Sequence, residues 1–235
     1  GGLDTLNFSS LKALQTLGIY IVMFISFEGI EGSGKTTNLS HAVGFLQDKG
    51  HDCVITREPG GTRIGEKIRA ILLDPSSKEM DPLTELLLYT ADRSQHIKEL
   101  IAPFLSAGKT VVCDRYYDAT VVYQGYARGL DMELILRLHR LLFENLKPDI
   151  TILLDLPPEI GLSRAWKQID NGVRDRVETR FEEETLSFHN KVRSGYLEIA
   201  RLEPKRFRII DASKEPDLVR EEIALTLSEE IDVTQ

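Results

Sequence analysis

The residues best suited to chemistry begin with a glycine-rich loop near the start of the chain. It matches the pattern G-x-x-x-x-G-K-[ST] and directly precedes a helical pattern. Glycines let the backbone curl so that successive N–H groups point at phosphate oxygens, beside the positive end of a helix dipole. The pattern therefore predicts an ATP-phosphate site in which Lys35 reaches the β- and γ-phosphates and Thr36 ligates Mg²⁺. Its predicted ATP contacts are Gly29, Ile30, Glu31, Gly32, Ser33, Gly34, Lys35, Thr36 and Thr37.

Three arginines lie in further polar motifs along the chain, at Arg57, Arg93 and Arg115. The planar guanidinium matches phosphate oxygens at two points. A kinase of small phosphorylated molecules must hold two polyanions in line, so these arginines suit a second anionic ligand. For Arg57 and Arg115 the alternative is an ion pair with a neighbouring acid, Glu58 or Asp114.

The elements that must position these residues alternate between strand and helix. Short runs rich in Val, Ile, Leu or Phe predict buried strands over 19–28, 52–57, 110–114, 150–155 and 207–211. Helical patterns fill the intervals over 36–49, 64–73, 82–107, 131–144, 158–167, 178–202 and 215–228. The alternation predicts an α/β fold, a three-layer doubly wound sheet of five parallel strands that binds its ligands beyond the strands' carboxyl ends.

Taken together, the motifs resemble the thymidylate kinase family over residues 23 to about 228. The segments that carry the resemblance, besides the P-loop, are Arg57-Glu-Pro-Gly-Gly-Thr62, Tyr89-Thr-Ala-Asp-Arg93 and Asp114-Arg-Tyr-Tyr-Asp-Ala-Thr120-Val-Val-Tyr123-Gln124. This order is not shared by adenylate, shikimate or guanylate kinases. The resemblance implies the P-loop nucleoside-monophosphate kinase fold and the phosphorylation of dTMP to dTDP, with ATP as donor and Mg²⁺ as cofactor.

The resemblance also implies roles for individual residues around the dTMP phosphate and base. Arg57 and Arg115 bind the phosphate, with Arg115 also counted as catalytic beside Lys35. Arg93 reaches the thymine carbonyl, and Asp114 organises Mg²⁺ and its waters. Tyr89 stacks on the base, at a position where Phe is more usual in the family. The alternative for Tyr89 is a place in the apolar stripe of its helix.

The remaining implied contacts concern the sugar and the edge of the base. Glu31 contacts the sugar 3′-OH, and Tyr123 closes over the 2′ carbon and disfavours a ribose; the alternative for Tyr123 is a core aromatic. Thr120 and Gln124 are expected at the base edge. Ala119 replaces a serine often found in the family, which removes one possible hydrogen bond.

A mobile lid at about 164–180 is expected to supply the catalytic arginine. The residue after Glu31 is Gly32, whereas eukaryotic-type members of the family carry an arginine there. The bacterial-type pattern therefore implies lid donors, because the transferring phosphoryl group needs a cation. The candidates are Arg164, Arg174 and Arg176. The alternative is a solvated helix pair in which these arginines meet nearby acids.

Composition limits the partners that the chain can have. The chain has 235 residues, 42% of them hydrophobic, and a formal net charge of −8. This charge gives no bulk attraction to nucleic acid or to an anionic bilayer, so neither is expected as a partner. A polyanion must be held by a local basic cluster, with the acidic balance on the outer surface. The two cysteines, Cys53 and Cys113, make no disulfide framework, which favours the cytoplasm.

Residues 1–22 are predicted to be a leader without chemistry, ahead of a single kinase domain over 23–235. Leucines recur there at roughly helical spacing, but a signal peptide is rejected because Lys12 is the only cation before Lys35 and no cleavage site follows. Gly1-Gly2 is interpreted as a remnant and Met23 as the natural start. An amphipathic interaction helix is the alternative.

Four smaller expectations concern Asp155, the segment 211–213, the histidines and the oligomeric state. Asp155 is interpreted as structural. The segment 211–213 resembles the loop that touches adenine in these kinases, and the alternative is a helix N-cap. The five histidines show no metal-ligand spacing. The family implies a homodimer, which an apolar stripe on the helix 131–144 permits; its leucines are Leu134, Leu138, Leu141 and Leu142.

Two other classes of function remain open from the sequence. A deoxynucleoside kinase would share the fold but prefer the nucleoside, and a nucleotide-dependent regulator would keep the P-loop without a second phosphate site.

Overall fold

Five parallel strands form the centre of the structure, a computed structural model that describes residues 22–173 and 176–233. They are β1 (Phe24–Glu28), β2 (Cys53–Arg57), β3 (Thr110–Asp114), β4 (Ile150–Asp155) and β5 (Phe207–Asp211). Their order in the sheet is β2-β3-β1-β4-β5, and every neighbouring pair is parallel. The predicted five-stranded parallel sheet is confirmed.

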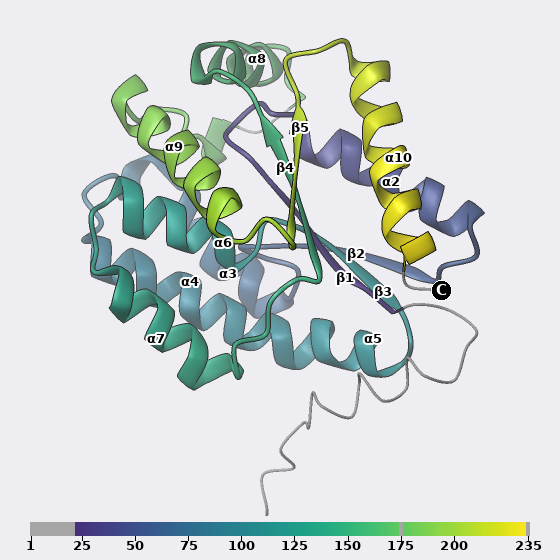
Figure 1. Cartoon of the computed structure of the whole chain (residues 1–235). Coiled ribbons are helices and arrows are strands. Elements are labelled where there is room, and N and C mark those ends of the chain that lie inside the picture. The colour runs from purple at the N-terminus through teal and green to yellow at the C-terminus, as the bar shows by residue number, and fades with distance from the viewer. Residues whose placement is uncertain (1–21, 174–175, 234–235) are drawn as a thin grey trace, which may run out of the picture.

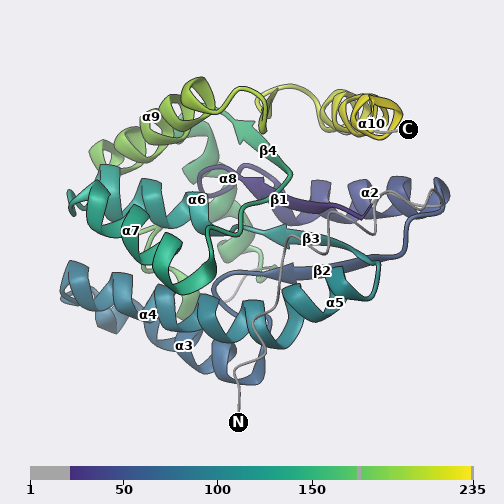
Figure 2. The same ribbon diagram turned by 60° about the horizontal axis from the view of Figure 1, so that its bottom comes forward.

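Helices cover both faces of this sheet (Figures 1 and 2). On one face lie α2 (Lys35–Asp48) and α10 (Pro216–Val233), which contact each other. The other face carries α3 (Arg63–Leu73), α4 (Pro82–His96), α5 (Ala102–Ser106), α7 (Met132–Phe143) and α9 (Leu186–Leu202). The helix α8 (Pro158–Asp170) follows β4 directly and lies beyond the strand ends. All five residues of β1 are buried, and they include the polar Ser26 and Glu28 as well as Phe24, Ile25 and Phe27.

The register of the strands brings the chemical motifs to one edge. Phe27 of β1 and Arg57 of β2 both pair with Asp114 at the end of β3. The ladder continues for one residue, because the Glu58 amide donates to the Asp114 carbonyl at 3.0 Å and the Arg115 amide to that of Phe27 at 3.0 Å. The P-loop and the segments after β2 and β3 therefore leave the sheet side by side.

Side-chain caps fix where several helices begin. The Thr62 hydroxyl accepts from the Gly65 amide at 2.9 Å at the start of α3. Asp81 caps α4, whose first residue is Pro82, and Thr185 caps α9. These residue types satisfy the free amides of a first helical turn.

Some helix boundaries predicted from the sequence differ from those in the structure. The helix expected over 82–107 is α4, a π-helical turn (Ile97–Ile101) and α5. The helix expected over 178–202 begins only at Leu186, because Thr185 caps it there. Before it lie turns and a 3₁₀ turn (Arg176–Glu178).

Two helical segments were not predicted. The residues after β3 form α6 (Tyr117–Thr120) and a π-helical turn (Val121–Ala127), and a 3₁₀ turn (Pro75–Ser77) precedes α4. In the strand expected over 19–28, β1 begins at Phe24, and residues 19–21 lie outside the described residues.

The predicted leader lies almost wholly outside the described residues, which begin at Val22. Across the described parts of the chain, no helix combines the length and apolar character needed to cross a membrane.

Candidate active site

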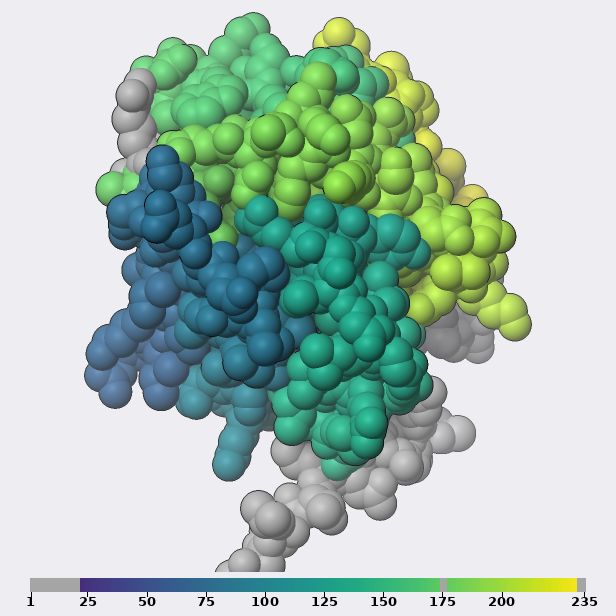
Figure 3. Space-filling view, turned by 90° about the vertical axis from the view of Figure 1, so that its left-hand side faces the viewer, coloured from purple at the N-terminus to yellow at the C-terminus, as the bar shows by residue number. Residues whose placement is uncertain are grey.

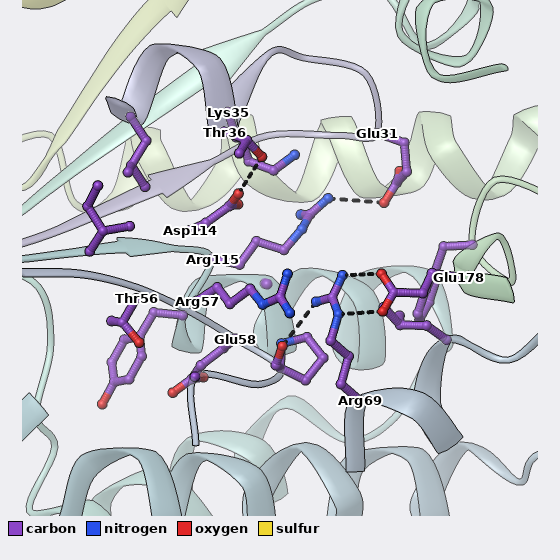
Figure 4. A pocket seen from close by; sticks show the side chains of 18 of the residues that line it. Glu31, Lys35, Thr36, Thr56, Arg57, Glu58, Arg69, Asp114, Arg115 and Glu178 are labelled. Carbon is purple, nitrogen blue, oxygen red and sulfur yellow. Dashed lines mark hydrogen bonds and ion pairs between the residues drawn. The ribbon is translucent and has the colours of Figure 1, made fainter. Parts of the chain in front are cut away.

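A cleft of about 710 Å³ opens where the ends of β1, β2 and β3 meet. Figure 4 shows side chains from the P-loop, from β2 and β3 and from α3 and the segment after α8 turning into it. The predicted site residues that line it are Glu31, Gly32, Gly34, Lys35, Thr36, Thr37, Arg57, Tyr89, Arg93, Asp114, Arg115, Thr120, Tyr123 and Gln124. The structure thus brings the P-loop and all three arginine motifs to one cavity.

The P-loop has the backbone geometry that its glycines predict. Gly32 and Gly34 adopt φ of 68° and 84°, in the left-handed region that favours glycine, and Gly34 directly precedes α2. The Lys35 ammonium donates to the carbonyls of Ile30 at 2.8 Å and Gly29 at 3.1 Å. Burial, followed by the positive charge of Arg115, lowers the pKa of Lys35 to about 8.

An oxygen pair stands at the junction of the P-loop and β3. The Thr36 hydroxyl donates to Asp114 Oδ2 at 2.9 Å (Figure 4). Hydroxyl and carboxylate oxygens are ligands that Mg²⁺ accepts, and Mg²⁺ usually takes only one or two protein ligands beside phosphates and water. Among the described residues no group of three His, Cys, Asp or Glu side chains could hold a metal. This donor set therefore fits a nucleotide-bound Mg²⁺ better than a metal held by protein alone.

Arg115 is fixed in the cleft by contacts from three elements. Its backbone has φ of 66°, which a residue with a side chain rarely adopts. Its guanidinium donates to Glu31 Oε1 at 3.0 Å and to the Tyr196 hydroxyl at 3.1 Å, and it lies 5.0 Å from the ring centre of Tyr123. The Tyr123 hydroxyl also donates to Glu31 Oε1, at 2.6 Å.

Glu31 is surrounded by positive and donating groups. Its second oxygen lies 3.1 Å from Nδ1 of the buried His189. Burial favours the neutral carboxyl, but the contact with His189 and the charges of Arg115 and Lys35 outweigh it, so the pKa of Glu31 lies below its ordinary value. Glu31 is therefore ionised in the cleft.

Behind Arg115 lies a buried acid that sequence reasoning missed. Glu28 accepts hydrogen bonds from the Tyr196 hydroxyl at 2.7 Å and the Tyr116 amide at 2.8 Å. Burial, followed by the charge of Asp118, raises the pKa of Glu28 to about 7. An acid closing an otherwise apolar strand was the available signal.

Arg93 and Arg57 differ sharply in their surroundings. Arg93 is 2% exposed; its Nε donates to Glu58 Oε2 at 2.8 Å and its Nη2 to the Thr120 hydroxyl at 2.9 Å. The Arg57 side chain is 47% exposed and pairs with the equally exposed Glu66 at 2.9 Å. The Arg57 pair is therefore easily exchanged, whereas the charge of Arg93 is matched inside the protein.

The residues expected to bind the base line the same cleft as Arg93. Tyr89 is half-buried, and burial raises the pKa of its hydroxyl. The Gln124 amide donates to Glu85 Oε1 at 2.8 Å, so its orientation is fixed from behind. Glu85 is fully buried and also pairs with Arg128 and Arg180.

Of the lid candidates, Arg164 has a described side chain. Arg164 does not line the cleft and donates instead to the Ala212 carbonyl at 2.8 Å, in the segment expected to touch adenine. Arg174 lies outside the described residues, and the structure describes only the backbone of Arg176.

Ion pairs fix residues on either side of α8. Glu178 forms a two-point ion pair with Arg69 of α3, at 2.7 and 2.9 Å (Figure 4). Asp155, interpreted as structural, forms a similar pair with Arg193 of α9, at 2.8 Å for both bonds.

Known proteins of one family are similar to this chain. It matches the family model described as thymidylate kinase over residues 27–223. It is 60% identical over 190 residues to a thymidylate kinase of Desulfosudis oleivorans, covering 81% of this chain and 89% of that protein. It is 52% identical over 205 residues to one of Syntrophotalea carbinolica, covering 87% and 94%.

A solved structure agrees with these sequence matches. The fold is similar to the crystal structure of thymidylate kinase from Ehrlichia chaffeensis, with a TM-score of 0.69 and 33% identity. The match covers 88% of this chain and 98% of that one.

Proposed function

This chain belongs to the thymidylate kinase family, and from that premise we propose how its cleft performs the reaction. The chain is a nucleoside-monophosphate kinase that transfers a phosphoryl group from ATP to dTMP and forms dTDP. The observation that carries our proposal is the convergence of Arg57, Arg93 and Arg115 on the cleft that holds the P-loop. A P-loop beside a second set of phosphate-matching groups suits two ligands held in line.

The donor side is assigned to the P-loop. Its backbone amides and Lys35 bind the ATP phosphates, because they stand at the N-terminus of α2. Thr36 and Asp114 hold Mg²⁺, which when bound neutralises charge on the phosphate oxygens. The hydrogen bond between these two side chains supports this assignment, since it places both oxygens at one point.

The acceptor side is assigned by the state of each arginine. Arg57 and Arg115 bind the dTMP phosphate, because the ion pair of Arg57 with Glu66, seen among the described residues, is exposed and can be exchanged for an anion. Arg93, whose charge Glu58 matches, suits a neutral carbonyl of thymine. Tyr89, Thr120 and Gln124 surround the base, and Glu31 and Tyr123 face the sugar.

The transition state requires a further cation, and we assign it to the lid at about 164–180. Arg174 and Arg176 are the first candidates, and Arg164 must release the Ala212 carbonyl to take part. Replacing each by Ala separately should lower turnover at least tenfold for the residue that contacts the phosphoryl group, which corresponds to about 1.4 kcal/mol of barrier. Three variants with unchanged turnover would exclude the lid donors.

The direct test of the metal and donor assignments is a coupled ATP assay with dTMP. Wild-type enzyme should require Mg²⁺ and lose activity in chelator. Lys35→Met should be inactive, and Asp114→Asn should need a higher Mg²⁺ concentration for half-maximal rate. Full activity in chelator, or an unchanged Mg²⁺ requirement in Asp114→Asn, contradicts the assignment.

Three further assignments concern the whole chain. Residues 23–235 are assigned to one kinase domain. The protein is assigned to the cytoplasm, where its free thiols Cys53 and Cys113 would stay reduced. The third assignment is a homodimer.

The α7 helix offers the surface for the homodimer. Leu141 and Leu142 of α7 are 70% and 56% exposed. The segment that contains α7 lies on the face turned to the viewer in Figure 3. Light scattering should give twice the mass of one chain, and Leu141→Glu should halve it while Leu225→Glu on α10 does not. A monomer for wild type, or an intact Leu141→Glu dimer, contradicts the proposal.

A further inference from the structure

A cluster of polar side chains lies buried directly behind Arg93, and the roles assigned so far leave it unexplained. It consists of Thr56, Glu58 and His96, which are 7%, 3% and 0% exposed. Nδ1 of His96 lies 2.9 Å from Glu58 Oε1, and Nε2 lies 2.6 Å from the Thr56 hydroxyl. Burying so many polar groups is costly unless each has a partner, and here each has one.

The direction of these hydrogen bonds follows from their chemistry. Glu58 lies against Arg93, and an ionised carboxylate can only accept. His96 must therefore donate from Nδ1 to Glu58. In the neutral imidazole Nε2 then carries no proton and accepts from the Thr56 hydroxyl.

The result is that both oxygens of Glu58 are held, Oε1 by His96 and Oε2 by Arg93. Arg93 in turn has its Nε on Glu58 and its Nη2 on the Thr120 hydroxyl and the Tyr116 carbonyl. Within the described residues its Nη1 makes no hydrogen bond, and Arg93 lines the cleft. The series of hydrogen bonds that begins at His96 thus ends at Arg93, whose two Nη1–H groups are available to a ligand.

The same cluster supports the loop that follows Arg57 at the end of β2. A Cβ added at Gly61 would lie 2.7 Å from the Thr56 hydroxyl and 3.0 Å from His96 Nε2, so the loop backbone rests on these two groups. The Gly60 amide donates to Asp92 Oδ1 at 3.1 Å, from the turn of α4 that also bears Arg93. The helix α4 therefore positions both the loop that follows Arg57 and Arg93 itself.

We propose that His96 is a positioning residue for pyrimidine selection: its Nδ1–H fixes Glu58, and Glu58 aims Arg93 at a ring carbonyl. This proposal rests on the assignment of Arg93 to the thymine carbonyl. A pyrimidine with an acceptor at its 4-position is favoured, and dCMP, which carries an amino group there, meets Arg93 N–H groups with its own donors.

Two amide variants separate positioning from simple packing. In His96→Asn the side-chain amide can occupy the place of Nδ1 and donate to Glu58, whereas in His96→Gln it reaches the place of Nε2 and contacts Thr56. The KM for dTMP should rise at least tenfold in His96→Gln and at most threefold in His96→Asn. The KM for ATP and the kcat should stay within threefold of wild type in both. The preference for dTMP over dCMP should fall at least fivefold in His96→Gln only.

His139→Asn is the matched control, because His139 is a buried histidine of α7 that hydrogen-bonds the Leu146 carbonyl at 2.8 Å and does not line the cleft. It should lower the melting temperature without changing the KM for dTMP. Equal changes in KM for His96→Asn and His96→Gln, or none in either, would overturn the proposal.

A measurement on wild-type protein does not depend on how the variants fold. Nitrogen NMR of the His96 ring should show a proton on Nδ1; an unprotonated Nδ1 overturns the proposal. Failure of the proposed function is distinguishable, because wild-type enzyme would then not phosphorylate dTMP, whatever the state of His96.

Discussion

At the scale of single residues, Lys35 shows how the cleft trades stability for function. Its ammonium is buried among the P-loop carbonyls and next to Arg115, which lowers its pKa to about 8. Below pH 8 the folded protein therefore keeps the Lys35 ammonium charged in surroundings that disfavour the charge. In the unfolded chain, water solvates the same ammonium. Phosphates of a bound nucleotide would relieve this cost.

Lys35→Met should accordingly stabilise the ligand-free protein while removing activity. At pH 7 we expect the free energy of unfolding in urea to rise by on the order of 2 kcal/mol, since each pKa unit corresponds to about 1.4 kcal/mol and some hydrogen bonding is lost. Because the folded pKa is lowered, wild type regains this stability as pH rises from about 8 towards 10.5. The difference between the two proteins should therefore shrink at pH 10. A less stable Lys35→Met protein at pH 7 contradicts the account.

Residues in continuous motifs could be predicted from the sequence, and residues that act through packing could not. The sequence predicts Arg57, Arg93 and the P-loop as site residues because their neighbours in the chain define them, and the structure brings Arg57, Arg93 and residues of the P-loop to one cleft. His189 and His96 were missed as site residues, since their partners Glu31 and Glu58 lie 158 and 38 residues away in the chain. No local pattern records such a contact.

At the scale of elements, the approach of α8 to the P-loop depends on two glycines. A Cβ added at Gly161, in the first turn of α8, would lie 2.5 Å from the Glu31 carbonyl, and one at Gly32 would lie 1.9 Å from the Gly161 carbonyl. Backbone therefore meets backbone here, and neither partner can turn aside as a flexible side chain would.

Gly161→Ala should push α8 away from the P-loop and raise the KM for ATP at least tenfold in steady-state assays. Gly44→Ala is the matched control, because Gly44 lies inside α2 and an added Cβ there would meet nothing within 4 Å. That variant should keep its activity and gain about 0.5 to 1 kcal/mol of stability. An unchanged KM for ATP in Gly161→Ala would refute the tight contact.

The segment between α8 and α9 is held to α4 by a buried ion pair. Arg180 and Glu85 are 3% and 0% exposed, and removing one partner of such a pair leaves a buried charge short of compensation. Arg180→Met should therefore lower the free energy of unfolding by about 3 kcal/mol. The same substitution at Arg201, whose pair with Glu198 is exposed and screened by water, should change it far less. Similar losses in both variants would contradict this distinction.

The errors in predicting elements have the same origin as the missed residues. The charged pattern over 178–185 is typical of a helix, but Glu178 and Arg180 pair with Arg69 and Glu85, and the chain turns to reach them. The helical segment 117–127 was missed, although the strands on either side, β3 and β4, have the bounds that were predicted. Its position over the cleft follows from packing against α9, the largest helix contact that it makes.

At the scale of the whole molecule, the charge of the cleft differs from the expectation. The acidic balance was expected on the outer surface, around a basic crevice. Among the described residues, the charged side chains that line the cleft are five cations and five acids, namely Lys35, Arg57, Arg69, Arg93, Arg115, Glu31, Glu58, Asp114, Glu178 and Glu182. Their formal charges cancel, so the lining described is neutral rather than basic, and the net charge of −8 comes from residues elsewhere in the chain. Under the proposed function, an incoming phosphate would displace Glu66 from the exposed pair with Arg57, whereas the buried pair of Arg93 with Glu58 would stay intact.

The central claim is that one cleft binds a phosphorylated pyrimidine nucleoside as acceptor. It is tested most directly by measuring kcat/KM, with ATP and Mg²⁺, for dTMP, thymidine and dCMP side by side. Thymidine lacks the phosphate for Arg57 and Arg115, and dCMP lacks the carbonyl for Arg93. We predict a value for dTMP at least a hundredfold above each of the others. A value for thymidine equal to or above that for dTMP would contradict the account.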